Sequence, residues 1–271
     1  MNTIDTPSSW RNPVRARLEA GQPVFGLGIT TASAEVAAQA ATLGFHLLWV
    51  EMEHSPITLE TLRLMVLATR ALPATVFARV PVVELWTAKR VLDQGVGGVI
   101  FPFIGTPEQA MRAAAACKYP PLGKRGSGAG AAARTWPSPG NYYDSADANV
   151  MTVCVVEDVS GLDNIDAIAA TPGIDVIFIG TSDLSFALGL RGRLNEPALD
   201  AAIARIVKSA RRFGKFLGLP VWSAEEIHHY LEEGFLFFWC GTEIGLMENG
   251  ARQLLEPFGI SGGADGQGAL F

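Results

Sequence analysis

The sequence predicts an α/β fold, a (β/α)8 TIM barrel in which eight parallel strands alternate with eight helices. Two observations support this fold. Short, nearly continuous apolar runs recur along the 271-residue chain, as expected for strands that are covered on both faces. Stretches with apolar residues spaced three and four apart separate these runs, which is the pattern of repeated βα units. An open doubly wound sheet is the main alternative, but no G-x-G-x-x-G sequence follows the first predicted strand to support it.

The individual elements follow from these runs and from the residues that flank them. The predicted strands are residues 24–29, 47–51, 75–79, 98–103, 150–157, 175–179, 216–221 and 235–239. The predicted helices are residues 34–43, 59–71, 84–93, 107–117, 162–170, 197–213, 224–233 and 243–255. Ser33, Thr58 and Thr106 precede three of these helices and are suitable N-caps. Glycines follow five helical runs, where a left-handed C-cap residue is favoured, namely Gly44, Gly95, Gly173, Gly214 and Gly234.

The domain organisation is simple. We expect one barrel domain over residues 1–257, with a short N-terminal helical extension, and a Gly-rich C-terminal tail over residues 258–271. The only long connection covers residues 118–149 and is rich in Gly, Ala and Pro. Connections of that length in a compact domain are usually lids or binding loops, so we expect this one to serve the functional site.

Composition and charge exclude several classes of protein. Apolar runs all fall short of the roughly 18 residues that a membrane span needs, and the first ten residues lack the apolar core of a signal peptide. A net charge of −6 without a basic block argues against a nucleic-acid partner. Cys117, Cys154 and Cys240 are far apart and form no CxxC pair, which favours reduced thiols in a cytoplasmic protein.

Two carboxylates follow consecutive apolar strands, where the rim of a barrel collects functional groups. Glu157 and Asp183 are these residues. A carboxylate beside so much apolar surface is paired, protonated or bound to a metal. Two carboxylates would leave room on Mg²⁺ or Mn²⁺ for substrate oxygens and waters. The alternative is that Asp183 caps a helical turn and Glu157 pairs with a lysine.

Other strand ends carry a histidine, an arginine and a Gly-Thr-Ser turn. His54 could shuttle protons near neutral pH, oriented by Glu51 or Glu53, although it could also be a surface loop residue. Arg79 could hold a carboxylate or an oxyanion, or it could form a structural salt bridge with one of those glutamates. Gly180, Thr181 and Ser182 precede a possible helix start, whose backbone N–H groups would suit an anion.

These stretches resemble the HpcH/HpaI family of class II pyruvate aldolases, over most of the chain. The resemblance is carried by residues 49–56 (WVEMEHSP), 79–81 (RVP), 89–95 (KRVLDQG), 119–126 (YPPLGKRG) and 171–185 (TPGIDVIFIGTSDLS), in this order. The chain departs from the family pattern at three places that bear on the choice of substrate. Glu51 replaces a common Asp, the residues before Glu157 are two valines, and Thr181-Ser182 replace Pro-Ala.

The resemblance implies a barrel whose last helix is exchanged between subunits, and a homo-oligomer, commonly a hexamer built as a trimer of dimers. It also implies a divalent metal ion, Mg²⁺, Mn²⁺ or Co²⁺, on the carboxylates that match Glu157 and Asp183. Arg79 would contact the keto oxygen and His54 would take part in proton transfer. Asp93 would approach that histidine from across a subunit boundary.

The predicted activity is therefore that of a metal-dependent aldolase, a carbon–carbon lyase. It would cleave a 4-hydroxy-2-oxo acid to pyruvate, or a related 2-oxo acid, and an aldehyde through an enolate. Catalysis would rest on His54, Arg79, Glu51 and Asp93, with Arg79 and residues 180–182 binding the substrate. An oxaloacetate-type decarboxylase using the same enolate is one alternative. A non-catalytic protein that binds a 2-oxo acid or a metal is another. Neither nucleic acid nor membrane is an expected partner.

Overall fold

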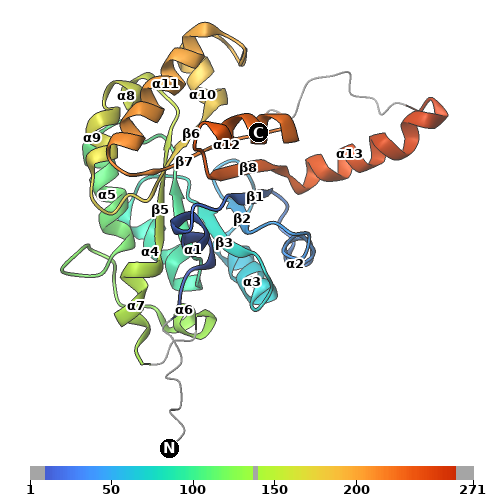
Figure 1. The fold of residues 1–271 in the computed structure, drawn as a ribbon. Coiled ribbons are helices and arrows are strands. Elements are labelled where there is room, and N and C mark those ends of the chain that lie inside the picture. The colour runs from blue at the N-terminus through green and yellow to red at the C-terminus, as the bar shows by residue number, and fades with distance from the viewer. Residues whose placement is uncertain (1–9, 137–139, 261–271) are drawn as a thin grey trace, which may run out of the picture.

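The computed structural model describes residues 10–136 and 140–260, and it shows a closed barrel of eight parallel strands in chain order (Figure 1). The predicted (β/α)8 fold is confirmed. Every predicted strand is present; β1, β2 and β3 have the predicted bounds, and the ends of the others differ by up to three residues. The strands are β1 (Val24–Ile29), β2 (Leu47–Glu51), β3 (Thr75–Arg79), β4 (Gly98–Phe101), β5 (Met151–Val156), β6 (Val176–Ile179), β7 (Phe216–Pro220) and β8 (Phe237–Thr242).

Helices surround this barrel, and their starts follow the predicted caps. The side-chain oxygens of Ser33, Thr58 and Thr106 each accept a backbone N–H in the first turn of their helices. The predicted helix at 162–170 is two helices that meet at Asn164. The helices are α1 (Pro13–Glu19), α2 (Ala34–Ala40), α3 (Leu59–Thr69), α4 (Leu85–Gln94), α5 (Pro107–Cys117), α6 (Gly130–Thr135), α7 (Tyr142–Asn149), α8 (Val159–Asp163), α9 (Ile165–Ala170), α10 (Thr181–Ala187), α11 (Pro197–Arg212), α12 (Ala224–Glu232) and α13 (Glu243–Leu255), followed by the short 3-10 helix η1 (Glu256–Phe258).

The long connection between α5 and β5 corrects the sequence prediction, because it is not a bare loop. It carries α6 and α7, and these helices pack on a small cluster that includes Tyr119 and Tyr142. The side chain of Arg125 is buried between the two tyrosine rings, with its guanidinium carbon 4.7 Å from the centre of the Tyr119 ring. Alanines dominate α6, and their helix propensity outweighs the glycines around them.

The barrel buries apolar side chains on both faces of its strands. One cluster fills the interior and includes Trp49, Phe77, Phe178 and Phe237. A larger cluster lies between the strands and the surrounding helices. Since side chains alternate along a strand, every second residue points into the barrel. The same alternation determines which side chains at the strand ends face the mouth of the barrel.

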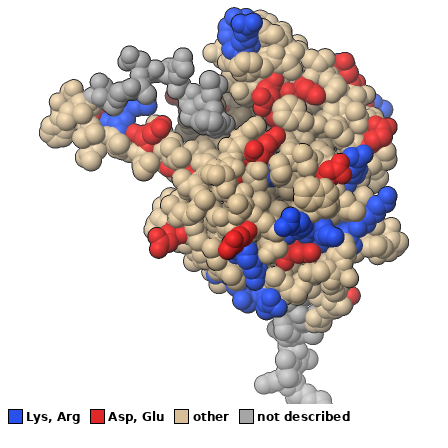
Figure 2. Space-filling model, turned by 180° about the vertical axis from the view of Figure 1, so that it is seen from behind, with Lys and Arg blue, Asp and Glu red and all other residues tan. Residues whose placement is uncertain are grey.

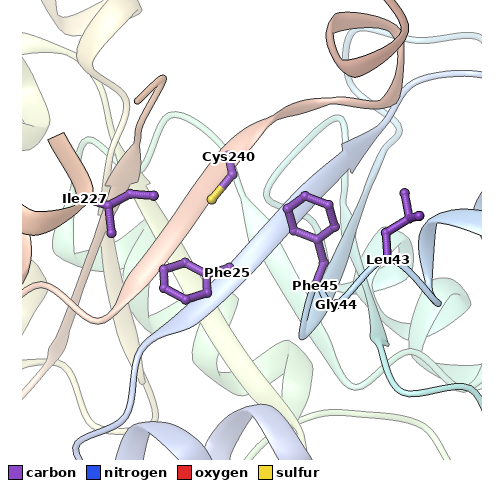
Figure 3. A pocket seen from close by; sticks show the side chains of 6 residues that line it. All are labelled: Phe25, Leu43, Gly44, Phe45, Ile227 and Cys240. Atoms are coloured by element: carbon purple, nitrogen blue, oxygen red, sulfur yellow. The ribbon is translucent and has the colours of Figure 1, made fainter. Parts of the chain in front are cut away.

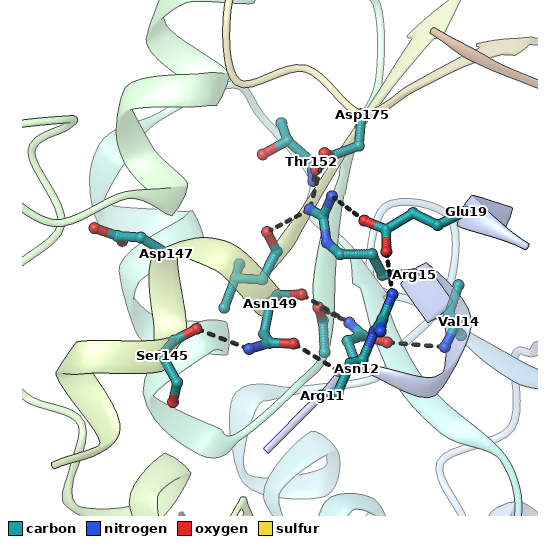
Figure 4. A network of polar contacts seen from close by, with 12 residues as sticks. Arg11, Asn12, Val14, Arg15, Glu19, Ser145, Asp147, Asn149, Thr152 and Asp175 are labelled. Atoms are coloured by element: carbon teal, nitrogen blue, oxygen red, sulfur yellow. Dashed lines mark hydrogen bonds and ion pairs between the residues drawn. The ribbon is translucent and has the colours of Figure 1, made fainter. Parts of the chain in front are cut away.

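Helix α1 closes the barrel at the N-terminal ends of its strands (Figure 4). Its Val14 and Leu18 are buried in the interior cluster. Around them, Arg15 pairs with Asp175 at 2.8 Å, and the side-chain amide of Asn12 donates to the backbone oxygens of Gly97 and Asn149. The predicted N-terminal helical extension is thus α1, which covers the N-terminal ends of the strands. The C-terminal ends of the strands form the open end of the barrel.

Helix α13 projects from the barrel and buries none of its residues (Figure 1). Its apolar side chains face outward, with Met247 and Leu254 68% and 69% exposed. Its first residue is tied to the barrel mouth, because Oε1 of Glu243 accepts the backbone N–H groups of Thr30 and Thr31 at 2.8 and 2.6 Å. The predicted Gly-rich tail lies, from residue 261 onward, outside the described residues.

The surface carries mixed charge. Figure 2 shows acidic and basic side chains interspersed on the face seen from behind. Within residues 10–136 and 140–260, the helices are all too short or too polar to cross a membrane. Cys117, Cys154 and Cys240 are free thiols; the first two are buried and Cys240 is half-buried.

Candidate active site

Charged side chains gather at the C-terminal ends of the strands, as the sequence predicts. Glu51 and Arg79 are the last residues of β2 and β3 and are directly paired across the two strands. Glu157 directly follows β5, and Gly180 directly follows β6. The neighbouring registers of β5 and β6, with Val156 opposite Ile179, place Glu157 and Gly180 side by side at the rim.

Arg79 is held by two glutamates from the end of β2. Its Nε lies 2.5 Å from Oε2 of Glu51 and 3.3 Å from Oε2 of Glu53. These are the ion pairs that the sequence left open as a structural alternative. They engage only the Nε, and in residues 10–136 and 140–260 the two terminal nitrogens of Arg79 form no hydrogen bond. The pairs therefore orient the guanidinium and leave its outer edge for an anion.

Glu51 also shapes the loop that carries His54. Its Oε1 accepts the backbone N–H groups of Glu53 and His54 at 2.7 and 3.0 Å, and its Oε2 accepts the indole N–H of Trp49 at 3.3 Å. The imidazole Nε2 of His54 lies 3.5 Å from Oε2 of Glu53, and half of the side chain is exposed. Glu51 thus positions the backbone of His54, while Glu53 faces its ring.

Glu157 is only 2% exposed, and it has an unusual electrostatic environment. Burial raises its pKa to about 7, with the backbone N–H of Phe103 and the charge of Arg79 opposing the rise and Asp183 and Glu53 adding to it. The Phe103 N–H donates to Oε1 at 2.8 Å. Among the described residues, Glu157 has no ion-pair partner, so the alternative of a lysine partner is not supported.

Asp183 lies in the first turn of α10, next to Glu157. The N-cap of that helix is Gly180, which makes no side-chain cap bond. Asp183 therefore does not cap the helix, although the helical turn that the sequence allowed is present. Its carboxylate forms no ion pair or hydrogen bond within the part of the chain that the structure describes. Thr181 is buried and Ser182 is exposed at the same helix start.

The space between these carboxylates depends on Gly180. A Cβ added to Gly180 would lie 2.5 Å from Oε2 of Glu157, so a larger residue would displace the carboxylate. Within the described residues, Glu157 and Asp183 form no ion pair, and their oxygens are a donor set that would suit a hard divalent ion. No group of three or more His, Cys, Asp or Glu residues with metal-binding geometry occurs in the described ranges.

Asp93 is the one predicted catalytic residue that the protomer does not bring to this rim. It lies near the end of α4, where Oδ1 is 3.4 Å from Nη2 of Arg125. Burial raises the pKa of Asp93, although the charge of Arg125 opposes the rise. Within the described parts of the chain it makes no contact with His54. The expectation that Asp93 acts on another subunit remains a prediction.

Two groups at the site have no role that the sequence indicates. The Phe103 N–H reaches Glu157 from the loop after β4, which no pattern in the sequence indicates. The indole N–H of Trp49 donates to Glu51, whereas the sequence shows Trp49 only as part of an apolar strand. Glu53 contacts both Arg79 and His54, the two roles for which the sequence left Glu51 and Glu53 as alternatives.

Comparison with known proteins shows the family to which the chain belongs. Residues 25–250 match the HpcH/HpaI aldolase/citrate lyase family. A hydroxypyruvate/pyruvate aldolase from Paraburkholderia phytofirmans is 33% identical over 255 residues, which cover 92% of this chain and 98% of the relative. A 5-keto-4-deoxy-D-glucarate aldolase from Escherichia fergusonii is 34% identical over 247 residues, 91% of this chain and 96% of the relative.

A solved structure shows the same fold. An HpcH/HpaI aldolase/citrate lyase family protein from Burkholderia cenocepacia superposes with a TM-score of 0.84 at 30% identity, covering 92% of this chain and all of that one. The match of the family to most of the chain confirms the resemblance that the motifs indicated. The chain belongs to the HpcH/HpaI aldolase/citrate lyase family and is a lyase of the aldolase type.

Proposed function

We propose that the chain is a divalent-metal-dependent aldolase that cleaves a 4-hydroxy-2-oxo acid to pyruvate, or a related 2-oxo acid, and an aldehyde. The observation that carries this proposal is the carboxylate pair of Glu157 and Asp183, which has no cationic partner among the described residues although Glu157 is buried. Mg²⁺, Mn²⁺ or Co²⁺ would neutralise the pair. When bound, such an ion would polarise the keto oxygen of the 2-oxo acid as a Lewis acid.

Arg79 would bind the developing oxyanion. Glu51 and Glu53 hold its Nε, so the terminal nitrogens are already oriented before substrate arrives. A preorganised donor of this kind contributes about 3 kcal/mol to transition-state stabilisation. The backbone at Gly180, Thr181 and Ser182 would line the carboxylate of the 2-oxo acid at the start of α10.

His54 would move the proton of the 4-hydroxyl group. Half of its side chain is exposed at the open rim, and the ring nitrogen faces Glu53. Burial raises the pKa of Glu53, with Arg79 and His54 opposing the rise, so this carboxylate is held in a less polar place than a surface glutamate. Glu53 can stabilise the imidazolium that forms when His54 accepts the proton.

We further propose that the enzyme is a homo-oligomer in which α13 of one copy covers the barrel of another. An apolar groove of about 270 Å³ lies on the outside of β1 and β8 (Figure 3). Its lining residues are Phe25, Leu43, Gly44, Phe45, Ile227 and Cys240. The groove lies between α2 and α12, where the eighth helix of a barrel normally packs, whereas α13 projects outward with its apolar side chains exposed.

Proton exchange at C3 of pyruvate tests the enolate chemistry directly. Wild-type protein with Mg²⁺ or Mn²⁺ should exchange these protons for deuterium, as followed by proton NMR. Glu157→Gln and Asp183→Asn should abolish the exchange and weaken Mn²⁺ binding measured by electron paramagnetic resonance. Asp200→Asn, on the exposed face of α11, removes one carboxylate elsewhere and serves as the control.

Two results would contradict the proposal. Full exchange after the metal has been stripped and chelated would remove the metal from the mechanism. Unchanged Mn²⁺ affinity in both site variants would place the ion elsewhere. Release of CO₂ from oxaloacetate at a rate far above aldehyde release from any 4-hydroxy-2-oxo acid would favour the decarboxylase instead.

A further inference from the structure

Charged side chains lie at the ends of β2, β3 and β5, whereas aromatic side chains lie along β7 and β8 of the same barrel. Phe216 of β7 and both Phe237 and Trp239 of β8 belong to the interior packing, and Pro220 is paired with Trp239 across the two strands. Trp222 lies two residues after Pro220, just beyond the end of β7, and Gly241 lies where the register of β8 against β1 shifts. These positions share the rim with Glu51, Arg79 and Glu157, which end or follow β2, β3 and β5.

Trp222 and Trp239 form one continuous aromatic surface there. Their ring centres are 5.3 Å apart with an interplanar angle of 86°, an edge-to-face pair. The Trp222 ring lies 3.9 Å from the place where a Cβ on Gly241 would stand, so it leans over β8. Trp239 leans over β1, because its Nε1 is 2.7 Å from the corresponding Cβ position of Gly28. Gly28 thus provides space that the Trp239 indole occupies, and Gly241 lies within van der Waals reach of the Trp222 ring.

Trp222 remains 52% exposed although it takes part in this packing. Its backbone N–H donates to Oε2 of Glu226 at 2.6 Å, which fixes the start of the loop after β7. The nearby carboxylate of Glu243 accepts the N–H groups of Thr30 and Thr31 and is held toward β1. The open face of Trp222 is therefore apolar, and it follows β7, the strand opposite β3 and Arg79 in the eight-stranded barrel.

The proposed function determines which part of the substrate meets this face. The 2-oxo acid end would lie at Glu157, Asp183 and Arg79, on β3, β5 and β6. The remaining carbons, from C4 onward, then extend toward β7, β8 and β1, where the carboxylate of Glu243 already accepts the backbone N–H groups of Thr30 and Thr31. These carbons become the aldehyde product when the C3–C4 bond breaks.

Resting on that function, we propose that Trp222 and Trp239 form the aldehyde subsite and that they select aldehydes with an apolar or aromatic substituent over polyhydroxylated ones. An indole face stabilises a phenyl group by stacking and by excluding water from it. A chain of hydroxyl groups would lose its water there and gain few hydrogen bonds in return.

The aldol direction of the reaction tests this selectivity. Pyruvate loses one C3 proton, its C3 bonds to the carbonyl carbon of the aldehyde, and a proton ends on the new hydroxyl group. The ratio of kcat/KM for benzaldehyde to kcat/KM for glyceraldehyde measures the preference. Wild-type enzyme should favour benzaldehyde, and Trp222→Ala should lower the ratio by about tenfold, since both stacking and burial of the ring are lost.

Trp86→Ala is the matched control, because Trp86 is similarly exposed, at 55%, in the first turn of α4 outside the barrel interior. That variant should keep the wild-type ratio. A wild-type preference for glyceraldehyde, or an unchanged ratio in Trp222→Ala, would overturn the proposal.

A binding measurement separates this inference from the aldolase chemistry. Benzyl alcohol carries the same ring but cannot react, and saturation-transfer NMR reports its contact with the protein. Transfer to its ring protons should fall by at least half in Trp222→Ala and stay unchanged in Trp86→Ala. The loss of transfer in Trp222→Ala is expected whether or not pyruvate exchanges its C3 protons. A failure of that exchange would refute the proposed function alone. Equal transfer in wild type and Trp222→Ala would refute the aromatic subsite while leaving the enolate chemistry in place.

Discussion

Arg79 donates through its Nε to Oε2 of Glu51 at 2.5 Å, and the two residues are paired at the ends of neighbouring strands. The same glutamate accepts two backbone N–H groups of the loop that carries His54. One carboxylate therefore sets the orientation of the arginine and the position of the histidine together.

Replacing Arg79 with lysine should lower kcat/KM by about 100-fold. A lysine keeps the charge, but it lacks the planar group whose one edge pairs with Glu51 while the other faces the substrate. Steady-state kinetics with a 4-hydroxy-2-oxo acid checks this, with the melting temperature as a control for folding. A near-normal rate would assign Arg79 a structural role only.

His54→Ala should slow aldol cleavage much more than decarboxylation of oxaloacetate. Only the first reaction requires a hydroxyl proton to be moved, and the exposed imidazole at the rim is placed for that transfer. Rates of both reactions on the same enzyme preparation provide the comparison. If the two rates fell by the same factor, His54 would not be the group that moves this proton.

Gly180→Ala should weaken Mn²⁺ binding by tenfold or more, on the order of 1 to 2 kcal/mol. The added Cβ would meet Oε2 of Glu157 at 2.5 Å and push the carboxylate away from Asp183. Gly130→Ala is a matched control, because a Cβ there meets no atom within 4 Å. Calorimetric titration with Mn²⁺ measures the effect, and equal affinity in all three proteins would show that Glu157 does not bind the ion.

Introducing charge on the outer face of α13 should dissociate the oligomer. In the double variant Met247→Glu and Leu254→Glu, two highly exposed apolar side chains can no longer enter the groove around Phe25 of another copy. Light scattering after size-exclusion chromatography should then give the mass of a single chain. Asn249→Glu, on the same helix, is the control and should retain the assembly. Retained assembly in the double variant would contradict the proposed exchange.

Alkaline pH should destabilise the fold through Cys117. Burial raises the pKa of its thiol from 9.0 to about 11. Because the folded pKa is the higher one, this contribution to stability is fully present below pH 9 and is lost as the pH rises through 11. The free energy of unfolding should fall by up to about 1.4 kcal/mol per pH unit from this group.

Urea denaturation of wild type and Cys117→Ala across this pH range isolates that slope. The variant should lose stability less steeply, both because the Cys117 thiol is absent and because the charge of Cys117 no longer adds to the rise in the pKa of the buried Cys154. Parallel slopes in the two proteins would mean that Cys117 is not the group that titrates.

The strands and the rim positions of Glu157 and Asp183 were predictable because each depends on local sequence. Barrel strands are buried on both faces, so they read as apolar runs, and Glu157 stands out as a carboxylate directly after one. The contact of Phe103 with Glu157 depends on the path of the loop after β4, which no local pattern specifies. The double role of Glu53 likewise requires the pairing of β2 with β3.

The bond from Glu243 to Thr30 and Thr31 joins the first residue of α13 to the loop after β1. A tilt or displacement of that helix would therefore reach the loop after β1 through the Glu243 side chain, in addition to reaching β8 through the backbone. Loss of a neighbouring subunit that packs against α13 would then change the shape of the barrel entrance, although none of the proposed catalytic residues would be altered.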